Sequence, residues 1–270
     1  MSHAPLFDFV FTPIEQVTPW GEPPHLSLGW YALTDGCYWI RVGENELFRY
    51  SDFFLNHFKF QGPYDRYFVG RLDADLGQLA FHALEPVPQE IAEFIPQVDQ
   101  WRRRRNSPPI PAEVIRGLDA ANGVSTNVGD EEFDIATDWW RARQMQVMHL
   151  KYNPIINIWT TDDIAHIAWE NRQHSIDGHP VWTAEAGCIE IPLEGFMAEI
   201  RDFRNRFITG MRERVDRVRQ SWSRPEIAID LSQLQNAQET EEISLPKTCS
   251  QTAQADWAPI LAILRRQFPR

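Results

Sequence analysis

Several features that mark familiar protein classes are missing from this sequence of 270 residues. Its three cysteines, Cys37, Cys188 and Cys249, form no C-x-x-C pair, which argues against a disulfide framework and against a zinc site. No stretch approaches the roughly 18 consecutive apolar residues of a membrane-spanning helix. Residues 1–12 lack the basic start and apolar core of a secretory signal. We therefore expect a cytoplasmic protein with no membrane segment.

The best-known catalytic motifs are also missing. The sequence contains no G-x-S-x-G, G-x-x-x-x-G-K, H-E-x-x-H or G-x-G-x-x-G. Their absence removes only the well-marked enzyme classes, because a pair of carboxylates, as in glycosidases, needs no local motif. The sequence therefore predicts no cofactor, and it favours a non-enzyme over an enzyme.

Positive charge is in short supply. The chain has 26 lysines and arginines against 38 acidic residues, a formal net charge of −12. This charge disfavours binding to nucleic acid or anionic lipid and raises the encounter rate with a basic partner. The basic run Trp101 to Arg105 follows a predicted helix, where cations also complement the helix dipole. We expect a protein partner, with a basic one favoured by charge.

The first half of the chain shows the pattern of strands followed by helices. Apolar alternation and turn residues predict an antiparallel meander in which the Asp-Gly at 35–36 joins two strands as a hairpin turn. Its predicted strands are 6–11, 26–33, 37–42 and 46–50. Apolar residues then recur at three or four positions, which is typical of helices. The predicted helices are 64–84, 86–95, 98–105 and 112–121.

The second half repeats this order. Residues 122–138, rich in Gly, Ser, Asn and acidic side chains, are the expected loop or boundary between sections 1–125 and 126–270, which could also form one compact domain. Strands are predicted at 142–150, 155–160, 164–169 and 188–191, and helices at 192–222, 232–242 and 256–267, with a loop at 245–254. Segregated strands and helices favour an α+β fold.

Five phrases of the sequence carry a resemblance to a known family. They are Pro19-Trp-Gly-Glu-Pro-Pro24, Leu26-Ser-Leu28 with Trp30, Leu33-Thr-Asp-Gly36 with Tyr38-Trp39-Ile40, Glu46-Leu-Phe-Arg-Tyr-Ser51 and Ile167-Ala-Trp-Glu-Asn-Arg172. With these phrases the chain resembles an uncharacterised bacterial family, a domain of unknown function, from Phe7 to about Leu264. The resemblance implies a bacterial, cytoplasmic protein, and it carries over no catalytic residue.

The stretch Trp169 to His179 is the most suggestive of chemistry. Glu170, His174, Asp177 and His179 could act as acid, base or ligand, with Arg172 beside them. No further ligand stands at a metal-binding spacing, so we predict no metal site. An ordinary polar turn explains the same residues, because Gly178 and Pro180 mark an exposed loop.

Protein binding is the leading hypothesis. Trp20 and Trp182 stand in loops, where packing explains a tryptophan least, and tryptophan is enriched in interface hot spots. The expected acidic surface is made of Asp35, Asp130, Glu131, Glu132, Asp162 and Asp163. An immunity protein or antitoxin-like neutraliser of a bacterial toxin is the most concrete form of this hypothesis, because acid complements the basic surface of many such toxins. A hydrolase using the Glu170 to His179 loop and a structural or regulatory module remain the alternatives.

Overall fold

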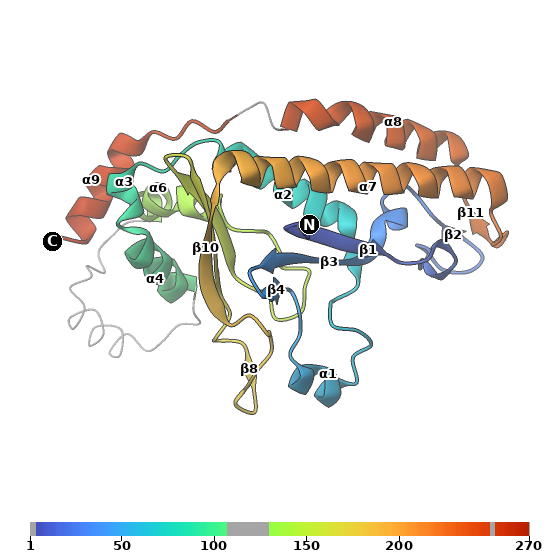
Figure 1. Cartoon of the computed structure of the whole chain (residues 1–270), viewed down its shortest axis with the longest axis horizontal. Coiled ribbons are helices and arrows are strands. Elements are labelled where there is room, and N and C mark those ends of the chain that lie inside the picture. The colour runs from blue at the N-terminus through green and yellow to red at the C-terminus, as the bar shows by residue number, and fades with distance from the viewer. Residues whose placement is uncertain (1–3, 107–129, 249–251, 270) are drawn as a thin grey trace.

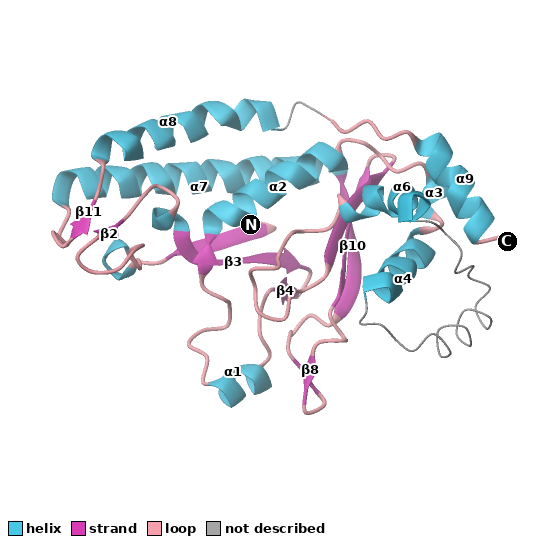
Figure 2. Ribbon diagram, turned by 180° about the vertical axis from the view of Figure 1, so that it is seen from behind, coloured by secondary structure: helices cyan, strands magenta, loops and turns pink. Residues whose placement is uncertain are grey.

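The structure, a computed structural model, describes residues 4–106, 130–248 and 252–269. Within these ranges the chain mixes helices with antiparallel sheets, which confirms the predicted α+β class (Figures 1 and 2). No helix in the described ranges is both long and apolar enough to span a lipid bilayer.

The first sheet is built around β3 (Asp35–Val42). Strand β3 pairs antiparallel with β1 (Phe7–Phe11) on one side and with β4 (Asn45–Leu47) and β5 (Tyr67–Phe68) on the other, in the order β1-β3-β4. The strand alternation of β1 directs Phe7, Phe9 and Phe11 towards phenylalanines of the longest helix. This aromatic layer is part of the main core.

The predicted hairpin at Asp35-Gly36 is wrong. These two residues begin β3, and β3 returns along β1 instead of along residues 26–33. Gly36 permits this pairing, because a Cβ at that position would lie 2.3 Å from the carbonyl oxygen of Val10. Of the predicted strand at 26–33, only β2 (Leu26–Ser27) is extended; it pairs parallel with β11 (Ile227–Ala228), and residues Ala32–Thr34 form the 3-10 turn η2. A second 3-10 turn, η1, covers Ile14–Gln16.

Three helices cover the first sheet (Figure 1). The predicted long helix is confirmed as α7 (Leu193–Ser221), whose apolar residues at three- and four-residue spacing are buried. Beside it lie α2 (Val69–Ala83), within the predicted helix 64–84, and α8 (Leu231–Thr248), which begins at the predicted place but extends into the predicted loop at 245–254. The short α1 (Asp52–Phe58), begun by the Ser51 cap, was not predicted.

The second sheet lies between two cores. Strands β6 (Ile156–Thr161), β7 (Ile164–Glu170) and β10 (Ala186–Pro192) pair antiparallel in the order β10-β7-β6, which confirms three predicted strands. Ile156, Ile158 and Ile167 face the main core, whereas Trp159 faces the second core. The helices of the second core are α3 (Gln89–Ala92), α4 (Ile95–Asn106), α6 (Asp130–Arg141) and α9 (Trp257–Gln267), and they lie on the far side of the sheet (Figure 2).

Two predictions around residue 140 are wrong. The loop predicted at 122–138 is helical from Asp130 onward, while residues 107–129, with the helix predicted at 112–121, lie outside the described residues. The strand predicted at 142–150 is irregular. Its alternation reflects a brief contact with β6, in which the Met145 amide donates to Ile156 and the Ile158 amide donates to Arg143, at 2.9 and 2.8 Å.

The two sections predicted from the sequence contribute to one core. Ile40 and Leu72 from residues 1–125 belong to the same buried cluster as Ile158 and Phe203 from residues 126–270. The first sheet, the second sheet and helix α7 therefore share a continuous apolar interior.

Candidate functional site

The predicted catalytic loop forms an exposed hairpin. Glu170 ends β7 and is paired with the exposed Arg172, whose guanidinium holds the pKa of Glu170 below its ordinary value. Asp177 lies in the exposed turn between β8 (Ser175–Ile176) and β9 (His179–Pro180), with a positive φ of 51°. His179 is exposed and stacks on Phe53, with ring centroids 4.0 Å apart. Each side chain is therefore engaged with a different neighbour.

His174 is the one member of this group that is half-buried, and burial lowers its pKa. None of Glu170, His174, Asp177 and His179 lines either of the two pockets that flank Tyr31, described below. Among the described residues, no group of three or more His, Cys, Asp and Glu is arranged to hold a metal ion. The geometry of the hairpin therefore offers recognition by separate surface groups rather than a shared catalytic centre.

The two predicted interface tryptophans differ in exposure. Trp182 is 2% exposed, because its indole stacks on Tyr50 at 4.4 Å inside a small core with Phe54. Trp20 is 48% exposed, and only the edge-on contact with Phe68, at 6.2 Å, supports its ring. Trp20 therefore remains available for a partner, and Trp182 is a core residue.

The predicted acidic surface is spread over several elements. Asp35 is 8% exposed and is bound by the guanidinium of Arg66, so its charge is neutralised within the chain. Glu132 pairs with Arg266 at 2.6 Å. The side chains of Asp162, Asp163 and Glu131 are exposed, the first two in the turn between β6 and β7 and the third on α6, which Asp130 begins.

An aromatic surface extends inward from Trp20. Phe68 contacts both Trp20 and Tyr31, with the Tyr31 ring 4.8 Å away. Tyr31 packs against the start of α2, where a Cβ on Gly70 would lie 3.2 Å from the Tyr31 ring. The absence of a side chain at Gly70 therefore lets this ring lie close against the helix. We call Trp20, Tyr31 and Phe68 the aromatic surface.

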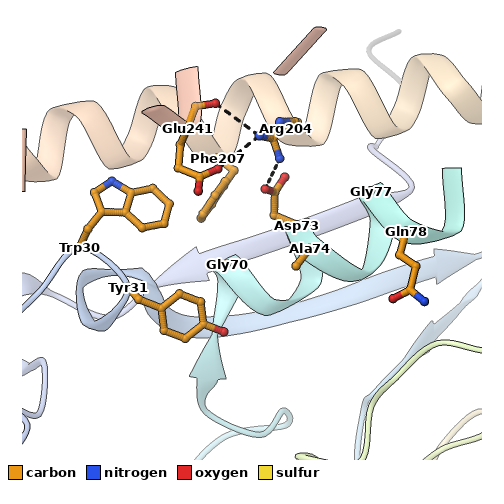
Figure 3. A pocket seen from close by; sticks show the side chains of 10 residues that line it. All are labelled: Trp30, Tyr31, Gly70, Asp73, Ala74, Gly77, Gln78, Arg204, Phe207 and Glu241. Carbon is orange, nitrogen blue, oxygen red and sulfur yellow. Dashed lines mark hydrogen bonds and ion pairs between the residues drawn. The ribbon is translucent and has the colours of Figure 1, made fainter. Parts of the chain in front are cut away.

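A pocket of about 290 Å³ opens beside Tyr31, between α2, α7 and α8 (Figure 3). Trp30 forms one wall and is held there by a hydrogen bond of 2.8 Å from its indole N–H to Gln238 of α8. Phe207 of α7 packs edge-on against Trp30 at 6.0 Å. We call this space the α2–α7–α8 pocket.

The polar side of the α2–α7–α8 pocket contains two carboxylates that share one guanidinium. Arg204 of α7 pairs with Asp73 of α2 and also with Glu241 of α8, the latter at 3.4 Å (Figure 3). Asp73 is 7% exposed, and its burial raises the pKa of its carboxyl to about 6 in spite of Arg204. Negative charge is therefore costly here, and a further cation would stabilise it.

A second pocket, of about 260 Å³, lies on the other side of Tyr31 and is lined by Tyr67, Arg71 and His149 among others. His149 receives a hydrogen bond of 2.5 Å from the hydroxyl of Tyr38, and burial lowers the pKa of His149 to about 4. Since Tyr38 is only 3% exposed, this neutral histidine holds a buried hydroxyl in place. Met148 at the rim is 78% exposed and extends the apolar surface.

The comparisons with known proteins give one result. The model of a family of unknown function, DUF5984, matches residues 6–263. The chain belongs to this family. No curated protein and no solved structure matches the chain. The DUF5984 match confirms the resemblance found in the sequence, and it includes Trp20 and every side chain of the α2–α7–α8 pocket.

The sequence gave only a partial signal for this site in the DUF5984 chain. Trp20 was found because a proline- and glycine-rich bend gives a tryptophan little to pack against. The pocket was missed, because Trp30 and its partner Gln238 lie 208 positions apart. Asp73 within the apolar pattern of α2 was the one available clue, since a buried charge requires a partner.

Proposed function

We propose that this DUF5984 protein binds a basic protein partner, and that its specific role is that of an immunity protein or antitoxin-like neutraliser of a bacterial toxin. The observation that supports binding most is the exposed Trp20, which is continuous through Phe68 and Tyr31 with a pocket that contains carboxylates. Exposed tryptophan beside a pocket is typical of an interface hot spot. The net charge of −12 would speed the approach of a basic partner.

Binding is favoured over hydrolysis by the state of the polar groups around Tyr31. Asp73 is already paired with Arg204, and His149 already accepts a hydrogen bond from Tyr38. Neither arrangement leaves a base beside an accessible nucleophile, as hydrolysis would require. A cytoplasmic location goes with this proposal, since the described cysteines, Cys37 and Cys188, are free thiols.

Affinity purification of the tagged protein from its native host tests the binding function. Wild type is compared with Trp20→Ala and with Phe58→Ala, whose ring on α1 is similarly exposed at 46%. We expect one basic protein to co-elute in near-equimolar amount with wild type and Phe58→Ala, and at least tenfold less with Trp20→Ala. Equal recovery with both variants, or no stoichiometric partner, would contradict the proposal.

The toxin-neutralising role has its own test. The co-purified partner is expressed alone and together with this chain, and growth of the host is measured. Growth arrest by the partner, relieved by co-expression of wild type but less by Trp20→Ala, is the expected result. A harmless partner would instead indicate a structural or regulatory module.

A further inference from the structure

The charges that line the α2–α7–α8 pocket do not balance. Asp73 and Glu241 carry two carboxylates, and Arg204 provides the single guanidinium among the lining residues. With both carboxylates ionised, this lining set has one negative charge in excess. Because Asp73 is 93% buried by the same measure that leaves it 7% exposed, its charge is poorly hydrated, and an additional cation within reach would be attracted strongly.

Aromatic rings form the opposite side of the same pocket. Trp30 and Tyr31 both line it, and each leaves part of its ring accessible. The faces of such rings attract lysine and arginine, and tryptophan does so best. The hydrogen bond from Trp30 to Gln238 fixes the indole, so no rotamer freedom is lost when a ligand enters.

The pocket has the size of a side-chain site. Its volume of about 290 Å³ lies just below the roughly 300–1,000 Å³ of common small-molecule sites. Gly70 and the exposed Ala74 contribute little bulk on the α2 side, which leaves the entrance open (Figure 3). One long, flexible side chain fits these dimensions better than a cofactor does.

We propose that the α2–α7–α8 pocket receives one cationic side chain, a lysine or an arginine, of the basic partner. The cation lies against Trp30 and Tyr31 and pairs with Glu241 and Asp73, while Arg204 keeps its place between the two carboxylates. This inference rests on the proposed function, and it identifies the chemical feature of the partner that the site recognises. The nearby Trp20 covers the apolar surface around that side chain.

Titration of the full-length protein with small probes tests the pocket directly. The probes are the acetylated methylamides of arginine, lysine and citrulline, the last being a neutral analogue of arginine. The readouts are the NMR signals of the Trp30 indole N–H and the Gly70 amide. We expect saturable shifts of both signals with arginine and lysine and at least tenfold weaker binding of citrulline. Equal binding of citrulline, or shifts that avoid these two signals, would overturn the proposal.

A matched pair of variants on α8 locates the charge. The side chain of Glu241 is 39% exposed, so Glu241→Gln preserves its shape with little risk to folding. Glu239, exposed on the same helix and bonded to Gln235, is the control. Glu241→Gln should raise the dissociation constant of the arginine probe about tenfold, and Glu239→Gln less than twofold. Equal effects of the two variants would overturn the assignment.

The two proposals fail in different ways. If the host partner is captured through Trp20 but the arginine and lysine probes do not bind, the pocket assignment is wrong and the binding function stands. If the probes bind as expected but no partner is captured, the pocket recognises a cation and the protein-binding function is wrong.

Discussion

Close packing around one glycine shows how single residues determine the second sheet. Gly187 of β10 lies opposite Trp169 of β7, and the buried indole crosses the space where a side chain would be. A Cβ at Gly187 would lie 2.3 Å from Cζ2 of Trp169. Backbone and ring cannot both keep their positions if that carbon is added.

Gly187→Ala should therefore lower the free energy of unfolding by about 1–3 kcal/mol, the usual cost of overpacking a core. Urea denaturation of the purified protein measures this loss. Gly29→Ala is the control, because a Cβ at Gly29 meets nothing within 4 Å, and its effect should stay within about 0.5 kcal/mol. Similar losses in the two variants would show that the contact with Trp169 does not matter.

Asp75 makes the stability of the protein depend on pH. It is 4% exposed, its Oδ1 pairs with Arg71 at 3.1 Å, and burial raises the pKa of its carboxyl from 3.8 to about 6. The folded state then holds this proton more tightly than the unfolded state does. The contribution of Asp75 to stability is therefore greatest below pH 3.8 and falls as the pH rises to about 6.

Comparison of wild type with Asp75→Asn isolates this contribution. The difference in free energy of unfolding, wild type minus variant, should be about 2 kcal/mol more favourable to wild type at pH 4.5 than at pH 7.5. Urea titrations at the two pH values measure it, and titrations of other groups largely cancel in the difference. A difference that does not change with pH, or that changes in the opposite direction, is incompatible with a raised pKa.

At the scale of elements, one buried arginine connects two helices on the second core. The Arg143 side chain, 1% exposed, follows α6 and donates 2.9 Å to the carbonyl oxygen of Trp139. It also donates to the carbonyl oxygen of Glu85, at 3.0 Å, and pairs with the Glu85 carboxylate at 3.2 Å. The segment after α2 is thereby joined to the end of α6.

Arg143→Met should destabilise the protein by about 3–5 kcal/mol, because it leaves the charge of Glu85 buried without its partner. The double variant Arg143→Met/Glu85→Gln should recover part of this loss. Arg141→Met, at a side chain that is 60% exposed, should change stability by less than about 0.5 kcal/mol. Thermal or urea unfolding of the variants provides the measurement, and a double variant no better than Arg143→Met would refute the role of the pair.

Elements with a repeated apolar pattern could be predicted from the sequence. Helix α7 carries such a pattern over its whole length, and β6 and β7 are separated by a turn of two aspartates. The Asp35-Gly36 hairpin failed because a glycine that serves a close strand contact has the same local sequence as one that serves a turn. The irregular stretch after α6 failed because a short bridge to β6 imitates strand alternation.

At the scale of the whole molecule, the two helical layers enclose the sheets, and the candidate site lies where α2, α7 and α8 meet (Figure 1). Trp20 could be predicted as a surface residue from its neighbours in sequence. Trp182 could not be predicted as a core residue, because the Tyr50 ring that covers it comes from a distant part of the chain. The pocket depends on tertiary contacts between three helices, and local patterns do not contain them.

Photocrosslinking in the native host tests the central claim most directly. A photoreactive benzoylphenylalanine replaces Trp20 in one strain and Phe58 in another, and adducts are identified by mass spectrometry. Binding through the aromatic surface predicts an adduct from position 20 to a single basic protein, with at least tenfold lower yield from position 58. No adduct at position 20, or equal adducts at both positions, would contradict the proposal that this surface binds a partner.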